Sequence, residues 1–367
     1  MSKRYDFVIV GGGIVGACLA EELALAGAGV LVLDAGPAPG HASVRAAGVT
    51  VPSLRYHDDP DFSDWLARAG TSLRADIARL TPGHGPFSLA LPILRLLREA
   101  DLGALTRATL RGHDLGKILQ PDETAALLPG AAPRPGTVAA RGEGLMVSGA
   151  DYLRAVQASA IRHGVRWRQD SEVTWYEEQP AGHGVTVRCA DGHAAAGDRV
   201  VLAAGAWTGQ LTGNRVPISP QRGQLVVITP PEPVRLIVSS HFYLAPLPAG
   251  PVVVGATEED AGFDLSCTAG AVARLLAFAI RTRPDLSDAA VLETRAGLRP
   301  VSGTGRPLIG RLPWTRRVYV AGGHAGHGLL TARLTAQGTA AGLVGKDWDG
   351  IPAAFCPAEE QACTSTT

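Results

Sequence analysis

The sequence predicts an α/β fold with a parallel sheet at its centre. Three apolar segments of strand length lead directly into glycines, at Tyr5–Gly13, Arg199–Gly205 and Arg317–Gly323. The first and the last of them continue into stretches with helical spacing. Strand–glycine–helix units are typical of parallel sheets, because the chain must turn sharply at the carboxyl end of each strand. The chain thus returns twice to the layout with which it begins.

Helices are predicted where apolar residues recur at helical spacing. One such stretch has Trp65 and Leu66 among its apolar positions, and another is followed by Gly164, which is placed as a C-terminal stop. The helices expected in chain order are Ile14–Ala26, Asp61–Leu80, Asp151–His163 and Leu329–Leu343.

Strands are predicted from short apolar runs bounded by turn residues. Prolines and glycines interrupt Thr81–Pro92, which we expect to be an irregular crossing between domains, and Pro246 should cut one strand short. Asp191-Gly192 should form a turn, and Pro357–Thr367 a disordered tail. The strands expected in chain order are Tyr5–Val10, Val30–Leu33, Val185–Cys189, Arg199–Ala203, Gln224–Thr229, Phe242–Leu244 and Val252–Gly255.

The first unit carries a complete nucleotide-binding motif. Gly11, Gly13 and Gly16 form G-x-G-x-x-G between the first strand and the first helix, and Asp34 follows 18 positions after the last glycine. The glycines let a pyrophosphate approach the backbone, and the helix N-terminus offers free N–H groups to it. Asp34 can accept hydrogen bonds from an adenosine ribose and disfavours a 2′-phosphate. The motif therefore predicts an adenine dinucleotide.

Composition excludes several classes of function. The 367 residues include 34 basic and 34 acidic side chains, so the chain has no net charge that would favour nucleic acid or an anionic membrane. Five scattered cysteines without C-x-x-C argue against a zinc site and a disulfide framework, and we expect them to be buried thiols. Tyr5–Val10 is too short for a signal sequence or a membrane span. Arginine far outnumbers lysine, and Ala and Gly are abundant. We expect a cytoplasmic, bacterial protein that holds no metal.

The final unit decides which dinucleotide is expected. A nicotinamide dehydrogenase normally places its catalytic domain after the nucleotide-binding half, whereas this chain returns to that layout near its end. Gly322–Gly328 precedes a helix whose N-terminus can stabilise the negative charge of a reduced flavin ring. We therefore expect the cofactor to be FAD.

The chain resembles the FAD-dependent D-amino-acid-oxidase-like family, and within it the glycine oxidase and sarcosine oxidase branch. The most diagnostic segments are VVGATEED, and GLRP followed by PLIG. The matching segments are Val8–Gly16, Ala42–Gly48, Val200–Thr208, Tyr243–Phe263, Ala296–Gly310 and Val318–Leu330.

The resemblance implies a Rossmann-type FAD-binding domain, similar to that of glutathione reductase, with an inserted, mostly antiparallel α+β substrate domain. The FAD-binding domain would comprise residues 1–80, 146–216 and 300–356, and the substrate domain residues 81–145 and 217–299. The cofactor-binding residues that it implies are Gly11, Gly13, Ile14, Val15, Gly16, Asp34, Ala35, Ser43, Arg45, Ala46, Ala47, Gly48, Val173, Ala204, Gly205, Trp207, Gly323, Gly326, His327, Gly328 and Leu329.

The resemblance also implies three catalytic residues. Arg299 matches the arginine that binds the substrate carboxylate, where a guanidinium can donate two parallel hydrogen bonds. Arg295 is the alternative, unless it faces solvent. Tyr243 matches a tyrosine that assists through its hydroxyl, or is a half-buried strand aromatic. His324 either shapes the flavin environment or caps the following helix.

Two positions have further open interpretations. Glu258 either faces the pocket, where it could favour a substrate ammonium, or forms with Glu259 a charge pair on a solvated turn, which we favour. The segment Ala325-Gly326-His327 replaces an aromatic and an arginine that are usual in the glycine oxidase branch, so the role of His327 stays open. Monomeric members of the sarcosine oxidase type attach the flavin through a cysteine near the substrate arginine. No cysteine of this chain lies between Cys267 and Cys356, so FAD is expected to be bound non-covalently.

The resemblance implies an enzyme that oxidises a small amino acid or N-alkylamino acid. A hydride would pass from Cα to flavin N5, and the resulting imine would be hydrolysed to a keto acid. Oxygen is the expected acceptor, which gives hydrogen peroxide. The alternative is a dehydrogenase of 2-hydroxy acids or amines that uses a quinone or a carrier protein. The oligomeric state is left open.

Overall fold

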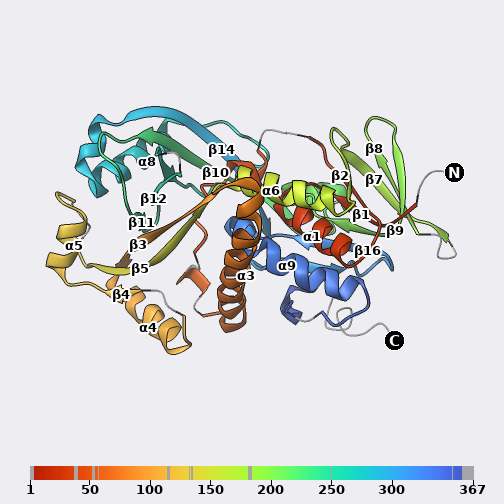
Figure 1. Cartoon of the computed structure of the whole chain (residues 1–367). Coiled ribbons are helices and arrows are strands. Elements are labelled where there is room, and N and C mark those ends of the chain that lie inside the picture. Colours follow the sequence, from red (N-terminus) through yellow and green to blue (C-terminus); the bar gives the residue numbers. More distant parts are fainter. Residues whose placement is uncertain are drawn as a thin grey trace.

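The computed structural model describes residues 4–36, 40–51, 54–56, 58–113, 116–131, 133, 135–180, 184–248, 250–348 and 350–357. In this part of the chain the strands form two eight-stranded sheets, which lie toward opposite ends of the molecule (Figure 1). The predicted α/β fold with a second, mostly antiparallel sheet is confirmed. The predicted tail lies outside the described residues from position 358 onward.

The first sheet is parallel at its centre, where β1 pairs with β2 and β9, β2 with β6, and β9 with β16. Antiparallel strands β15, β7 and β8 extend it. Its strands are β1 (Arg4–Val10), β2 (Val30–Leu33), β6 (Arg166–Arg168), β7 (Val173–Glu178), β8 (Val185–Cys189), β9 (Ala194–Leu202), β15 (Leu308–Arg311) and β16 (Val318–Gly322).

Alternating side chains of β1 build two cores on the two faces of this sheet. Phe7 and Ile9 pack against the helices α1 (Ile14–Leu25), α3 (Pro60–His84), α6 (Gly149–Arg162) and α9 (Gly328–Leu343). Val8 and Val10 pack on the opposite face, with side chains of β8 such as Val187. This period of two is expected of a strand that is buried on both faces. The four predicted helices are confirmed to within a few residues.

The second sheet has the order β14-β10-β13-β12-β11-β3-β5-β4, and only β11 and β3 pair in parallel. Helix α8 (Ala269–Thr282) packs on one of its faces. Its strands are β3 (Ser88–Arg98), β4 (Lys117–Ile118), β5 (Thr137–Val147), β10 (Ile218–Thr229), β11 (Ile237–Ser239), β12 (Tyr243–Pro246), β13 (Val252–Gly255) and β14 (Ala290–Ser302).

Short helical elements connect these layers. The remaining α-helices are α2 (Ala42–Arg45), α4 (Leu102–Leu110), α5 (Pro121–Leu127) and α7 (Thr208–Leu211), and the 3₁₀ turns are η1 (Leu54–Tyr56), η2 (Glu99–Asp101), η4 (Gly205–Trp207), η5 (Pro284–Asp288), η6 (Ala325–His327) and η7 (Ala353–Phe355). None of the described helices is both long enough and apolar enough to span a bilayer.

The prediction of an irregular crossing at Thr81–Pro92 is wrong at both ends of this segment. Helix α3 continues to His84, and β3 begins at Ser88 and contains Pro92. Proline is tolerated there because β11 pairs with β3 only from Ile93, so at Pro92 one edge of β3 has no partner strand. Pro246 likewise lies inside β12, beyond the end of its pairing with β11.

The predicted domain boundaries remain a prediction. The strands of the first sheet lie within residues 4–33, 166–202 and 308–322, and those of the second within 88–147 and 218–302. Cys18 and Cys189 are buried free thiols. The expectation is wrong for Cys267, which is only partly buried, and for Cys356, which is disulfide-bonded.

A buried cluster of charges joins α1, α3 and α9. Arg333 of α9 is 3% exposed and contacts Glu21 Oε2 of α1 at 2.5 Å, and its Nε lies 2.9 Å from Asp76 Oδ2 of α3. Arg79 contacts the same two carboxylates, and Tyr152 of α6 donates a hydrogen bond to Asp76. Burial opposes the charge of Arg333, but the surrounding groups, Cys18 first and then Asp76, Tyr152 and Glu21, raise the pKa of its guanidinium. The guanidinium therefore stays charged at the centre of the cluster.

We expect Arg333→Met to lower the free energy of unfolding by about 3–5 kcal/mol, because it leaves buried carboxylates without their main cation. Chemical unfolding followed by circular dichroism measures the loss. Arg316→Met, at an exposed position, is the matched control and should change stability little. Equal stability of the two variants would show that the cluster contributes nothing.

Candidate functional site

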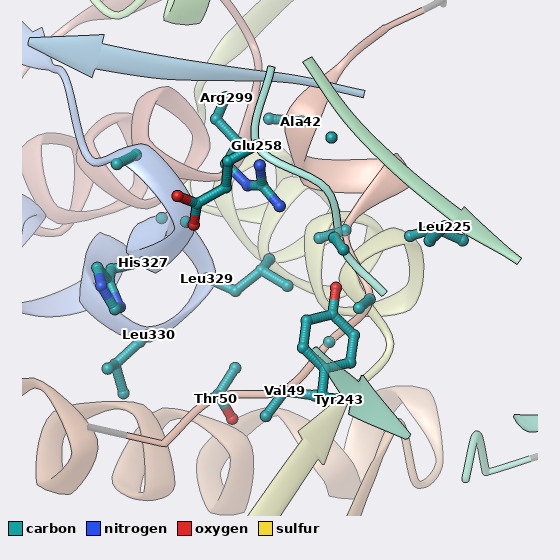
Figure 2. A pocket seen from close by; sticks show the side chains of 18 of the residues that line it. Ala42, Val49, Thr50, Leu225, Tyr243, Glu258, Arg299, His327, Leu329 and Leu330 are labelled. Carbon is teal, nitrogen blue, oxygen red and sulfur yellow. The ribbon is translucent and has the colours of Figure 1, made fainter. Parts of the chain in front are cut away.

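One cavity of about 2110 Å³ extends from the first sheet to the second. It begins at the carboxyl ends of β1, β2, β9 and β16, and it reaches Leu225 of β10 and Tyr243 of β12 (Figure 2). Ligands of parallel α/β sheets bind at this edge, where the strands end and the connecting loops separate.

The cavity brings together nearly all of the predicted site residues. Each predicted catalytic residue lines it, and so does each predicted cofactor-binding residue except Gly16 and Gly323. Gly16 has a packing role instead, because a Cβ at this position would collide with the carbonyl oxygen of Gly11. A Cβ at Gly323 would lie 3.0 Å from the Cβ of Ser302.

The glycine loop leaves open space on its cavity side. Gly11 has a φ of +102°, and a Cβ there would lie 2.5 Å from the carbonyl oxygen of Ala203. Beside Gly13, in contrast, Ser43 Oγ at 3.3 Å is the only atom of the described residues that a Cβ would approach. Asp34 accepts hydrogen bonds from the backbone N–H groups of Gly12 and Gly36, at 2.6 and 3.0 Å. These bonds fix its carboxylate at the cavity wall.

The N-termini of helices α1 and α9 face the cavity. At α9, which begins after His327, the N-cap side chain accepts no hydrogen bond. At α1 the N-cap residue Gly13 has no side chain to accept one, and Ser43 Oγ accepts from the first N–H group, that of Ile14, at 3.0 Å. Helices α3, α6 and α8 are each capped by the side chain of the N-cap residue. Free N–H groups and the helix dipole attract anionic groups. The cavity therefore fits a long ligand with a phosphate-bearing part at α1 and an anionic part at α9.

Arg299 and Tyr243 present polar groups to the same part of the cavity (Figure 2). Arg299 Nη1 donates to the carbonyl oxygen of Thr257 at 2.8 Å and contacts Gln221 Oε1 at 3.5 Å. Among the described residues, its Nη2 and Nε have no hydrogen-bond partner. Burial raises the pKa of Tyr243, although Arg299 and Arg295 act in the opposite direction. Tyr243 is thus a neutral phenol that can donate a hydrogen bond.

Glu258 and Glu259 have different surroundings, so the favoured interpretation as a charge pair on a solvated turn is wrong. Glu259 forms an ion pair with buried Arg222 at 2.6 Å. Glu258 lines the cavity, and its Oε1 lies 3.0 Å from Nη1 of Arg55 in η1. The pocket-facing alternative describes its position correctly.

Two histidines at the start of α9 are neutral. Burial, and secondly His327, lower the pKa of His324 to about 3, and its Nε2 lies 3.1 Å from Thr335 Oγ1. His324 therefore does not cap the helix, because its ring contacts the middle of α9. The pKa of His327 is lowered to about 4, mainly by burial and then by Arg55 and Arg299. Its ring packs edge-on against Tyr56.

Arg295 is neither exposed nor part of the cavity lining, so the solvent-facing interpretation is wrong. Its side chain is 18% exposed and pairs with Glu293, and burial lowers its pKa. Arg55 and Gln221 were not predicted from the sequence, although both line the cavity. Arg55 belongs to no motif. Its contact with Glu258 joins residues that are 203 positions apart in the chain, and a local sequence pattern cannot predict such a contact. The described residues contain no cluster that could hold a metal ion.

Comparison with known proteins identifies relatives along nearly the whole chain. A family model described as FAD dependent oxidoreductase matches residues 6–341. Glycine oxidase of Pseudomonas putida is 30% identical over 375 residues, which cover 97% of this chain and 99% of that protein. Glycine oxidase of Geobacillus kaustophilus is 28% identical over 359 residues, which cover 91% and 92% of the two chains.

Solved structures show the same relationship. Glycine oxidase from Geobacillus kaustophilus superimposes with a TM-score of 0.87 at 27% identity, and the match covers 97% of this chain and 98% of the other. Iminodiacetate oxidase from Chelativorans sp. gives a TM-score of 0.86 at 27% identity and covers 96% and 98%.

Because His324 is neutral in the folded protein, the free energy of unfolding should decrease as the pH falls. An unfolded chain protonates this ring near its ordinary pKa of 6.5, whereas the folded ring resists protonation down to about 3. Its contribution is therefore complete above pH 6.5 and is lost as the pH falls below it. Between pH 7 and pH 5, wild type should lose about 2 kcal/mol more unfolding free energy than His324→Gln. Urea unfolding at both pH values tests this, and parallel losses in the two proteins would contradict it.

Proposed function

Because the chain belongs to the family of FAD-dependent oxidoreductases, we propose that it oxidises small amino acids or N-alkylamino acids. Arg299 carries this proposal, since its partly unpaired guanidinium lines the same cavity as the glycine loop. Relatives that act on glycine and on iminodiacetate support the substrate class. We propose oxygen as the final acceptor, which would yield hydrogen peroxide.

The residues of the cavity fit FAD. The glycine loop and the N-terminus of α1 would hold the pyrophosphate, Asp34 the ribose, and the N-terminus of α9 the anionic edge of the ring. When bound, FAD accepts the electron pair and hydrogen that leave a substrate C–H bond. No cysteine is among the described residues that line the cavity, which supports non-covalent binding.

The protein's contribution to the reaction is to bind and orient the substrate. Arg299 would hold the carboxylate through its free N–H groups, and the neutral Tyr243 hydroxyl would donate a further hydrogen bond. The amine would lose its N–H proton while the adjacent carbon loses hydrogen and two electrons, forming a C=N bond. Water would then convert this imine into a keto acid and ammonia, or a primary amine. Correct positioning of the reacting carbon supplies most of the rate.

Gly13→Val should fold but retain little FAD. Its φ of −65° suits any residue, yet the new side chain would enter the space proposed for the pyrophosphate. FAD released by heat and measured by absorbance near roughly 450 nm gives the content. A wild-type FAD content would place the phosphates elsewhere, and flavin that stays on the denatured chain would contradict non-covalent binding.

Arg299→Ala should lower kcat/KM for anaerobic flavin reduction by an amino acid roughly 30- to 1000-fold, with unchanged FAD content. Arg299→Lys should recover little, because an ammonium lacks the planar fork. The matching amine without a carboxylate is the control, and it should be oxidised poorly by wild type and variant alike. Reduction of Arg299→Ala at the wild-type rate would show that another group binds the carboxylate.

A further inference from the structure

We propose that Arg299, Glu258 and Arg55 form a site of alternating charge for amino acids whose nitrogen carries a second, carboxylate-bearing arm. The proposal rests on the proposed function, because Arg299 binds the first carboxylate in both. It assigns Glu258 to the secondary ammonium and Arg55 to the second carboxylate.

The backbone around Glu258 is anchored on both sides. Gln224 exchanges hydrogen bonds with Thr257, whose backbone N–H donates to Gln224 O at 3.1 Å and whose Oγ1 accepts from Gln224 N at 2.9 Å. Glu259 and Arg222 exchange both backbone hydrogen bonds, at 2.9 and 3.0 Å. Neighbouring side chains of an extended segment point to opposite sides. With Thr257 and Glu259 held toward β10, Glu258 is directed into the cavity (Figure 2).

The same anchoring brings Glu258 close to two cations. The carbonyl oxygen of Thr257 accepts a hydrogen bond from Arg299 at 2.8 Å, and Arg55 lies 3.0 Å from the Glu258 carboxylate. Both arginines and Glu258 act on the pKa of His327, which agrees with their grouping around one part of the cavity. The side chains of Arg55 and Glu258 are 62% and 44% exposed. An ion pair this exposed contributes little, so charged groups of a ligand can replace it.

Charge complementarity identifies the ligand class. The order cation, anion, cation matches a ligand with the order carboxylate, secondary ammonium, carboxylate. Glycine or N-methylglycine would use only Arg299 and Glu258 and would leave Arg55 without a ligand group. Gly326 lies beside Arg299 without a side chain, which leaves room for a larger substrate. With N-(carboxymethyl)glycine, loss of two electrons and two protons to FAD and solvent, followed by addition of water, would give glycine and glyoxylate.

The kinetic test compares N-(carboxymethyl)glycine with N-methylglycine, which lacks only the second carboxylate. Wild type should favour the dicarboxylate in kcat/KM for anaerobic flavin reduction. Arg55→Met should lower the ratio of the two kcat/KM values roughly 10- to 100-fold. Arg281→Met removes an arginine that lines the cavity from α8, and it should leave the ratio unchanged. An equal effect of Arg55→Met on both substrates would overturn the proposal.

A binding test separates the charge array from the reaction. The probe 2,2′-thiodiacetate has both carboxylates but a neutral sulfur in place of the nitrogen, and its binding is followed by the change in the flavin spectrum. Arg55→Met should weaken its Kd roughly tenfold, whereas Glu258→Gln should tighten it, because a repulsive carboxylate is removed. The same Glu258→Gln change should weaken N-(carboxymethyl)glycine. Weaker binding of both probes in Glu258→Gln would overturn the assigned role of Glu258.

The two proposals fail in different ways. If no amino acid reduces the flavin while thiodiacetate binds with the predicted changes, the proposed oxidation is wrong and the charge array stands. If glycine reduces the flavin but the Kd for thiodiacetate is the same in wild type and Arg55→Met, the proposed oxidation is supported and the proposed charge array is wrong. FAD content, measured for every variant, confirms that each of them has folded.

Discussion

The position of Arg333 between two buried carboxylates determines how the cavity is built. Glu21 and Asp76 have almost no exposed surface, and buried carboxylates are tolerated only beside a cation. The three charged residues lie on α1, α3 and α9, so their attraction sets how these helices pack. Helices α1 and α9 also begin at the cavity wall. An ion pair in the core thus fixes the direction of the N–H groups at the ligand site.

Both ends of the cavity carry groups that attract anions. At the glycine loop, positive potential comes from backbone N–H groups rather than from side chains. At the other end, Arg299 and the first turn of α9 are positive, while His324 and His327 add no charge because burial lowers their pKa values. Glu258 contributes a negative charge to this end of the cavity, where its carboxylate lies 3.0 Å from Arg55 Nη1. The protein therefore offers anion-binding groups at both ends of the cavity, and Glu258 is the carboxylate to which we assign the substrate nitrogen.

The sequence was most informative where function imposes strict spacing. The strand–glycine–helix unit at Tyr5–Ala26 was predicted almost to the residue, because the chain has few ways to place glycines between a buried strand and helix. The second sheet was predicted only in part, since prolines such as Pro92 lie in strands where one edge has no partner. The contact of Arg55 with Glu258 could not be predicted. It depends on how two distant loops meet, and no local pattern encodes that.

The chain supplies the components of the dinucleotide site at opposite ends of its length. Glu21 pairs with Arg333, which lies 312 residues further along the chain. Strand β1 pairs with the distant β9 as well as with its neighbour β2. During synthesis on the ribosome, the glycine loop and α1 therefore emerge long before α9, the helix that packs against α1. Contacts this distant in sequence form slowly and late. The packing of α1 is therefore completed only after α9 has been translated, because the cation that pairs with Glu21 lies in α9.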